Sequence, residues 1–126
     1  MQIDTDLRSL TDAIEAVSAR YAQRFGIRRD LEWCLLKLGE ELGELTQAHL
    51  KRSGQARASD DNAELTRRFE DEMADVLGQL LVLAKLSGTD LLAALERKWL
   101  CWHPSRMSES SYREVASNNS TESSTK

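Results

Sequence analysis

Apolar residues recur at intervals of three and four positions along most of this chain, with polar residues between them. This spacing matches the 3.6-residue turn of an α-helix, so each such stretch is predicted to form an amphipathic helix. Four stretches show the pattern: residues 4–25, 31–52, 63–86 and 90–102. β-branched and aromatic residues are few, which favours helix over strand. We therefore predict an all-α fold.

The residues at the ends of these stretches are typical of helix ends. Gly26 and Gly88 follow the first and third stretches, and Asp30 and Asp90 precede the second and fourth. Glycine favours the left-handed conformation that closes a helix, and aspartate caps the free N–H groups at a helix start. Residues 53–62 contain Gly, Ser, Asp and Asn, a loop composition. The second and third helices are therefore predicted to form an antiparallel pair.

Each of these two helices carries an apolar stripe that we expect to face the core. The stripe of the second helix is Leu31, Leu35, Leu38, Leu42, Leu45 and His49, and that of the third is Phe69, Met73, Val76, Leu80 and Leu83. Because His49 lies on such a stripe, we interpret it as a core histidine and not as a metal ligand.

The length of 126 residues fits one domain. Residues 1–104 are predicted to form it, as four helices. Residues 105–126 are dense in Ser, Asn, Thr and Glu, so they bury too little apolar area to offset their ordering entropy and are predicted to be disordered. The sequence shows no secretory signal and no apolar stretch of about 20 residues, so we expect a cytoplasmic protein that is not in a membrane.

Two short acidic motifs stand out within the second and third helices. Glu40, Glu41 and Glu44 lie in the first motif, and Glu72 and Asp75 in the second. Residues three apart are neighbours on a helix surface, so each motif presents a carboxylate pair. The two pairs are equally far in sequence from residue 58. A reversal there brings Glu41 level with Asp75, and Glu44 level with Glu72. Projected on a helical wheel, these pairs lie about 110° from the apolar stripes, so they are predicted to flank the packing seam.

Four carboxylates that meet beside one seam repel each other unless a cation lies between them. Ligation by oxygen alone selects Mg²⁺ or Mn²⁺, and Mg²⁺ often recruits substrate phosphates. The formal net charge of −4 argues against a binder of polymeric nucleic acid. Without the motif acids the chain is close to neutral, so a metal-loaded site is compatible with an anionic ligand. The simpler alternative is that these acids form a solvated helix face.

At these motifs the chain resembles the MazG-type branch of the all-α nucleoside triphosphate pyrophosphohydrolase superfamily. The family pattern is EExxE followed, after a variable gap, by ExxD, and here residues 45–71 form the gap. The resemblance implies a four-helix domain that assembles as a helical-bundle oligomer, a homodimer or homotetramer. It also implies that Glu41, Glu44, Glu72 and Asp75 hold Mg²⁺ while water attacks the α-phosphorus of a nucleoside triphosphate. Glu40 matches the first acid of the pattern and would contact the metal, support its ligands or position water.

Three further residues are candidates for substrate binding. The segment ERKWLCWHP resembles the family's NEKFxRRHP, which makes Lys98 a candidate phosphate contact; the alternative is a solvated lysine near a helix end. Trp33 and Lys37 share a helix face with Glu44. Trp33 would stack on a base or pack against the first helix or another subunit, and Lys37 would neutralise phosphate or pair with Glu41.

The leading interpretation is an enzyme, a Mg²⁺-dependent nucleotide pyrophosphohydrolase that converts (d)NTP and water to (d)NMP and pyrophosphate, with a possible house-cleaning role. One alternative is the related phosphoribosyl-ATP pyrophosphohydrolase, and another is a non-catalytic helical interaction protein. A ferritin-like di-iron protein would need Glu-x-x-His pairs. Neither histidine has a glutamate three residues before it.

Overall fold

The computed structural model describes residues 6–58, 61–106, 113, 114 and 117. Residues 6–58 and 61–106 form four α-helices and two short 3₁₀ helices, and the described residues contain no strand, which confirms the predicted all-α fold. The chain divides into two compact units, residues 1–90 and 91–126. Most of the tail that we predicted to be disordered lies outside the described residues.

The first unit contains three helices whose ends agree closely with the sequence pattern. These helices are α1 (Leu7–Phe25), α2 (Leu31–Arg52) and α3 (Asn62–Leu86). Asp30 accepts a hydrogen bond from the Trp33 N–H at 2.8 Å, and Asp61 accepts one from the Glu64 N–H at 2.8 Å. Gly26 closes α1 at a φ of 65°, a left-handed conformation that glycine adopts without strain.

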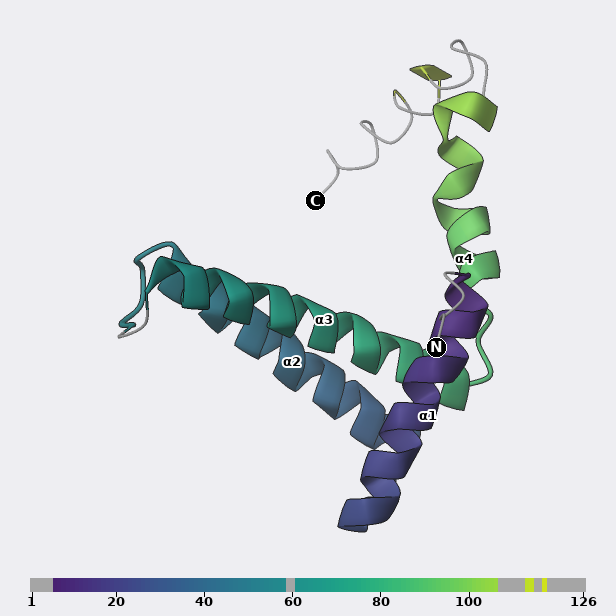
Figure 1. The fold of residues 1–126 in the computed structure, drawn as a ribbon. Helices are drawn as coiled ribbons and strands as arrows, with labels where there is room; N and C mark the ends of the chain where they lie inside the picture. The colour runs from purple at the N-terminus through teal and green to yellow at the C-terminus, as the bar shows by residue number, and fades with distance from the viewer. Residues whose placement is uncertain (1–5, 59–60, 107–112, 115–116, 118–126) are drawn as a thin grey trace, which may run out of the picture. The chain divides into compact units, whose positions relative to one another are not determined.

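In the first unit, α2 and α3 form the predicted hairpin. The two helices lie side by side along their length, and α1 packs against α3 at the end where α2 begins and α3 ends (Figure 1). The loop before α2 is fixed to α1 because Arg29 binds both carboxylate oxygens of Glu15, at 2.7 and 2.8 Å. The buried residues in the described part of the chain are Ala22, Cys34, Leu65, Leu81, Val82 and Ala84, of which Cys34, Leu81 and Val82 are buried most completely.

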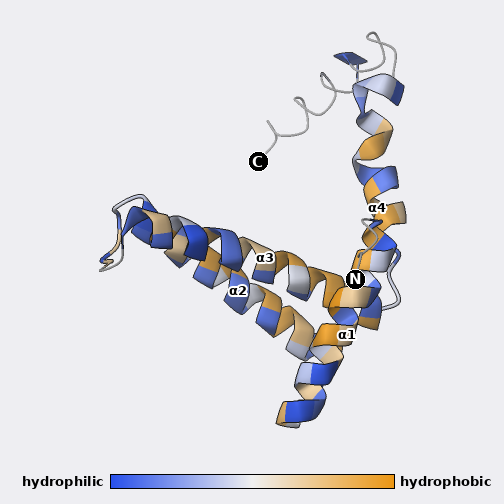
Figure 2. Ribbon diagram, viewed as in Figure 1, coloured by the Kyte–Doolittle hydropathy of each residue, from blue (hydrophilic) through white to orange (hydrophobic). Residues whose placement is uncertain are grey.

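The predicted core stripes are partly wrong. Leu35 and Leu42 of α2 are 56% and 54% exposed, Met73 of α3 is 48% exposed, and His49 is exposed as well. Leu38 and Leu45 of the predicted α2 stripe are half-buried as expected, and they are joined by Cys34, Glu41 and Ala48, which the stripe did not include. On each helix of the hairpin, the apolar residues cover a broader face than the part that the other helix contacts. Figure 2 shows apolar residues along the length of both α2 and α3, and several of them are exposed.

The second unit begins with α4 (Leu91–Lys98), which is shorter than the helix predicted to reach residue 102. It continues as two 3₁₀ helices, η1 (Leu100–Trp102) and η2 (Pro104–Arg106). The N–H of His103 bonds to the Leu100 carbonyl, three residues earlier, and His103 itself is extended, with ψ of 134°. Proline disfavours the α conformation in the residue before it, which explains the extended backbone of His103 before Pro104.

Within the described residues, no single helix is long and apolar enough to span a membrane, although α3 and residues 91–102 pass the same test when taken as a bent pair.

Candidate metal centre

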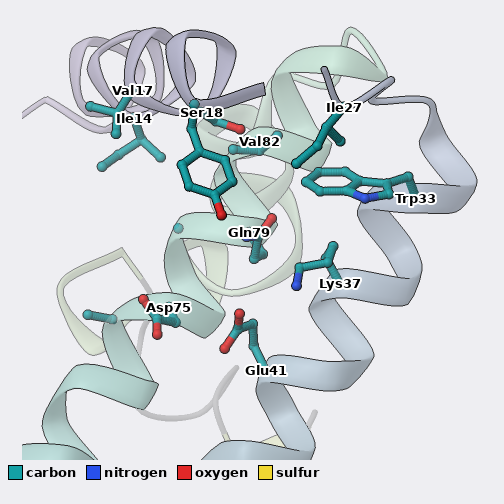
Figure 3. Close-up of a pocket in the computed structure, with 13 residues that line it drawn as sticks. Ile14, Val17, Ser18, Ile27, Trp33, Lys37, Glu41, Asp75, Gln79 and Val82 are labelled. Carbon is teal, nitrogen blue, oxygen red and sulfur yellow. The ribbon is translucent and has the colours of Figure 1, made fainter. Parts of the chain in front are cut away.

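The hairpin brings acidic side chains of both motifs together. Glu41 of α2 and Glu72 and Asp75 of α3 each offer a carboxylate oxygen, and these oxygens all lie within 4.8 Å of one another. Figure 3 shows the Glu41 side chain of α2 and the Asp75 side chain of α3 in the same part of the pocket. Carboxylates at this separation form a group that could hold a metal ion.

Glu41 and Glu72 lie closer to the seam than predicted. Both residues are half-buried, and the Oε2 atom of each is buried without a hydrogen-bond partner among the described residues. Asp75 and Glu44 are exposed. The predicted flanking position therefore holds for Asp75 and Glu44, whereas Glu41 and Glu72 face the partner helix. A buried carboxylate oxygen without a partner is costly, because it loses water and gains nothing in return.

The pKa values of Glu41 and Glu72 also show that burial disfavours their ionised carboxylates. Burial first, and then the negative charges of Asp75, Glu44 and Glu72, raise the pKa of Glu41 to about 7, and the positive charge of Lys37 offsets only part of this rise. The pKa of Glu72 is raised by burial first, and then by the charges of Glu44 and Asp75. The leading charged neighbour of Glu41 is thus Asp75, and that of Glu72 is Glu44. These are the cross-helix pairs predicted from their equal distance to the loop.

The donor set suits a hard divalent cation. It consists of carboxylate oxygens, which Mg²⁺ and Mn²⁺ prefer, and it includes neither of the two histidines nor either cysteine. A cation at this position would give the orphaned oxygens of Glu41 and Glu72 a partner and would offset the repulsion between the acids. The residues therefore fit a magnesium or manganese ion, although acidic clusters also occur without one.

Glu40 lies outside this cluster. Its carboxylate is exposed and accepts a hydrogen bond from Lys37 Nζ at 3.1 Å. Lys37 is therefore paired with the residue three positions later, and not with Glu41 as one alternative had it. The hydrogen bond to Glu40 raises the pKa of Lys37, and so do the negative charges of Glu40, Glu41 and Glu44. Lys37 consequently remains a cation close to the acidic cluster.

A pocket of about 620 Å³ opens next to the cluster, between the three helices of the first unit (Figure 3). Its lining includes Trp33 and Lys37, two of the predicted substrate-binding residues, together with Glu41 and Asp75. The sequence patterns did not identify the other main contributors, which are Ile14, Val17, Tyr21, Ile27, Gln79 and Val82. These residues come from α1, from the loop that follows it and from α3. Only the tertiary contact of α1 with α3 makes them neighbours.

The remaining predicted site residue, Lys98, is the last residue of α4. It belongs to the second unit, so the pocket and the acidic cluster are built without it. Comparisons with protein-family models, with curated proteins and with solved structures found no match to this chain.

Proposed function

We propose that this chain is a Mg²⁺-dependent nucleoside triphosphate pyrophosphohydrolase. The observation that supports this most directly is the convergence of carboxylates from two helices at the edge of a mixed apolar and charged pocket. Two of their buried oxygens have no hydrogen-bond partner in the part of the chain that the structure describes. A nucleotide matches this arrangement, because it carries a flat aromatic base at one end and a chain of phosphates at the other. The resemblance to the MazG-type motif points to the same chemistry.

In this proposal Glu41, Glu44, Glu72 and Asp75 hold the ion. When bound, Mg²⁺ would neutralise phosphate charge and polarise the phosphoanhydride. Water attacks the α-phosphorus, the bond from that phosphorus to the bridging oxygen breaks, and the products are the nucleoside monophosphate, pyrophosphate and a proton. Lys37 neutralises phosphate, and Glu40 positions Lys37 through their hydrogen bond. Lys98 is a further proposed phosphate contact.

The test is a screen for pyrophosphate release from NTPs, dNTPs and damaged nucleotides in Mg²⁺ or Mn²⁺. We expect at least one triphosphate to be cleaved, and expect Glu72→Gln to reduce kcat by about 100-fold or more because an ion ligand is lost. Glu70→Gln is the matched control, since Glu70 is an exposed acid on the same helix outside the cluster. If nothing is cleaved, or if Glu72→Gln is as fast as the native chain, the proposal is wrong.

The same screen, extended to phosphoribosyl-ATP, distinguishes a nucleoside triphosphate pyrophosphohydrolase from a phosphoribosyl-ATP pyrophosphohydrolase. Product from phosphoribosyl-ATP, with none from any nucleoside triphosphate, would reassign the chain to that reaction. A non-catalytic interaction protein would release no pyrophosphate and show no thermal shift with Mg²⁺.

We further propose that the chain functions as a homodimer or homotetramer. Leu31, Leu35 and Leu42 lie on one face of α2 and are between 41% and 56% exposed, and Met73 and Leu77 are about half exposed on α3. Apolar rows of this kind on neighbouring helices are typical of surfaces that pack against an identical chain.

Light scattering after gel filtration measures the oligomeric state directly. We expect Leu42→Glu to lower the mass while helicity is retained, and Gln47→Glu, at an exposed polar position of α2, to leave the mass unchanged. A native chain that is monomeric at micromolar concentration would contradict this part of the proposal.

A further inference from the structure

The pocket beside the acidic cluster has two chemically different ends. Glu41, Asp75 and Lys37 line one end, and apolar or aromatic side chains of α1, the following loop and α2 line the other (Figure 3). Its volume of about 620 Å³ lies within the range of small-molecule sites. The pocket therefore suits a ligand with an anionic part and a flat apolar part.

Besides Glu41, the pocket contains a second polar side chain with a buried oxygen that lacks a hydrogen-bond partner among the described residues, that of Gln79. This oxygen is the Oε1 atom of the side-chain amide. Gln79 is four residues after Asp75, so both lie on the same face of α3, about one turn apart. The amide is thus one turn farther along α3 than the carboxylate. A ligand that places an N–H group at this point satisfies the orphaned acceptor.

The aromatic residues of the pocket define the shape of that ligand. Trp33 contributes an indole from α2, and Tyr21 a phenol ring from α1, both among the lining residues. Aromatic side chains can stack on any of the nucleobases, because every base has a flat π-face. The side-chain amide of glutamine donates and accepts, so it pairs with a base edge that has an N–H donor beside an acceptor.

We infer that this pocket binds the nucleobase of the substrate and that Gln79 reads the edge of the base. This inference rests on the proposed function, and it assigns base selectivity to a residue outside both acidic motifs. Trp33 contributes affinity that differs little between bases, whereas Gln79 contributes the difference between them. Amino-bearing bases, such as cytosine and adenine, and imino-bearing bases, such as uracil, share this chemistry.

The test measures kcat/KM for dCTP, dATP, dGTP and dUTP, and for 2-deoxyribose 5-triphosphate, which has no base. We expect Gln79→Leu to lower kcat/KM for the preferred nucleotide by about 10- to 100-fold and to reduce the spread between bases. The base-free substrate is expected to change less than about twofold. The preferred base in the native chain shows whether an amino or an imino edge is read.

Two further variants separate selectivity from general damage. Trp33→Ala should lower kcat/KM for all four nucleotides by a similar factor, with their order preserved. Gln47→Leu makes the same side-chain change at an exposed position of α2 and should alter neither rate nor order. Circular dichroism confirms that each variant is folded. If Gln79→Leu preserves the ranking of bases while the chain hydrolyses triphosphates, the inference is wrong and the proposed function stands.

A binding measurement tests the inference if the chain shows no catalytic activity. If no triphosphate is cleaved, the proposed function fails, and calorimetric titration with the four deoxynucleosides in metal-free buffer still decides the inference. Binding to the native chain that Gln79→Leu weakens at least tenfold supports a base pocket. Absence of binding, or equal binding to both proteins, overturns it.

Discussion

Replacing Glu41 with glutamine should make the metal-free protein more stable at alkaline pH. The pKa of Glu41 is raised from 4.5 to about 7, mainly by burial and by the charge of Asp75. The folded state therefore binds a proton that the unfolded state has already released, and ionising Glu41 opposes folding. This destabilisation is nearly absent below pH 4.5, grows as the pH rises toward 7 and is complete above it.

The size of the effect follows from the shift. One pKa unit corresponds to about 1.4 kcal/mol, so the shift at Glu41 costs about 3 kcal/mol at pH 8 and about 1 kcal/mol at pH 5. Glu41→Gln keeps the side-chain volume and removes the charge. We expect its free energy of unfolding to exceed that of the native chain by up to about 3 kcal/mol at pH 8 and by less than about 1 kcal/mol at pH 5.

Urea denaturation in EDTA at both pH values, at one protein concentration, measures this difference. Glu40→Gln is the control, because Glu40 is an exposed neighbour whose loss removes only a surface ion pair with Lys37. Mg²⁺ should then stabilise the native chain at pH 8 and stabilise Glu41→Gln less. A Glu41→Gln chain that is no more stable at pH 8, or equally stabilised at both pH values, would refute this reasoning.

Three more predictions concern stability and thiol chemistry. Asp61→Ala should lower the free energy of unfolding by about 1 kcal/mol in urea, because the N-terminal cap of α3 is lost. Arg29→Ala should lower the free energy of unfolding by about 2–3 kcal/mol, because the half-buried Glu15 carboxylate loses its bidentate partner and is left as an unpaired charge. Adding Glu15→Gln removes that charge and should restore part of the lost stability. A double variant that restores none of it would contradict this explanation. Native protein should show one fast thiol with Ellman's reagent, Cys101, because Cys34 is buried and its pKa is raised by that burial. Rapid reaction at Cys34, identified by mass spectrometry, would contradict the packing of α2.

The sequence alone determined the helices and the register between two of them. Asp30, Gly26 and the residues of the loop predicted at 53–62 act on their immediate neighbours. The bounds of α2 therefore agree with the pattern, and α3 begins one residue earlier than predicted. Once the two helices and the position of the loop are known, counting residues from the loop shows which acids lie opposite each other in the hairpin. This is why the pairing of Glu41 with Asp75, and of Glu44 with Glu72, was predictable.

Only the tertiary structure decided which helix faces are covered. Leu35 and Leu42 have the spacing of a core stripe and yet are exposed, while Glu41 is half-buried in the seam. Likewise, no local pattern connects Tyr21 of α1 with Gln79 of α3, which line one pocket. Periodicity and capping are local properties of the chain. The choice among several apolar faces depends instead on contacts between distant segments, and those contacts are set by how the three helices pack together.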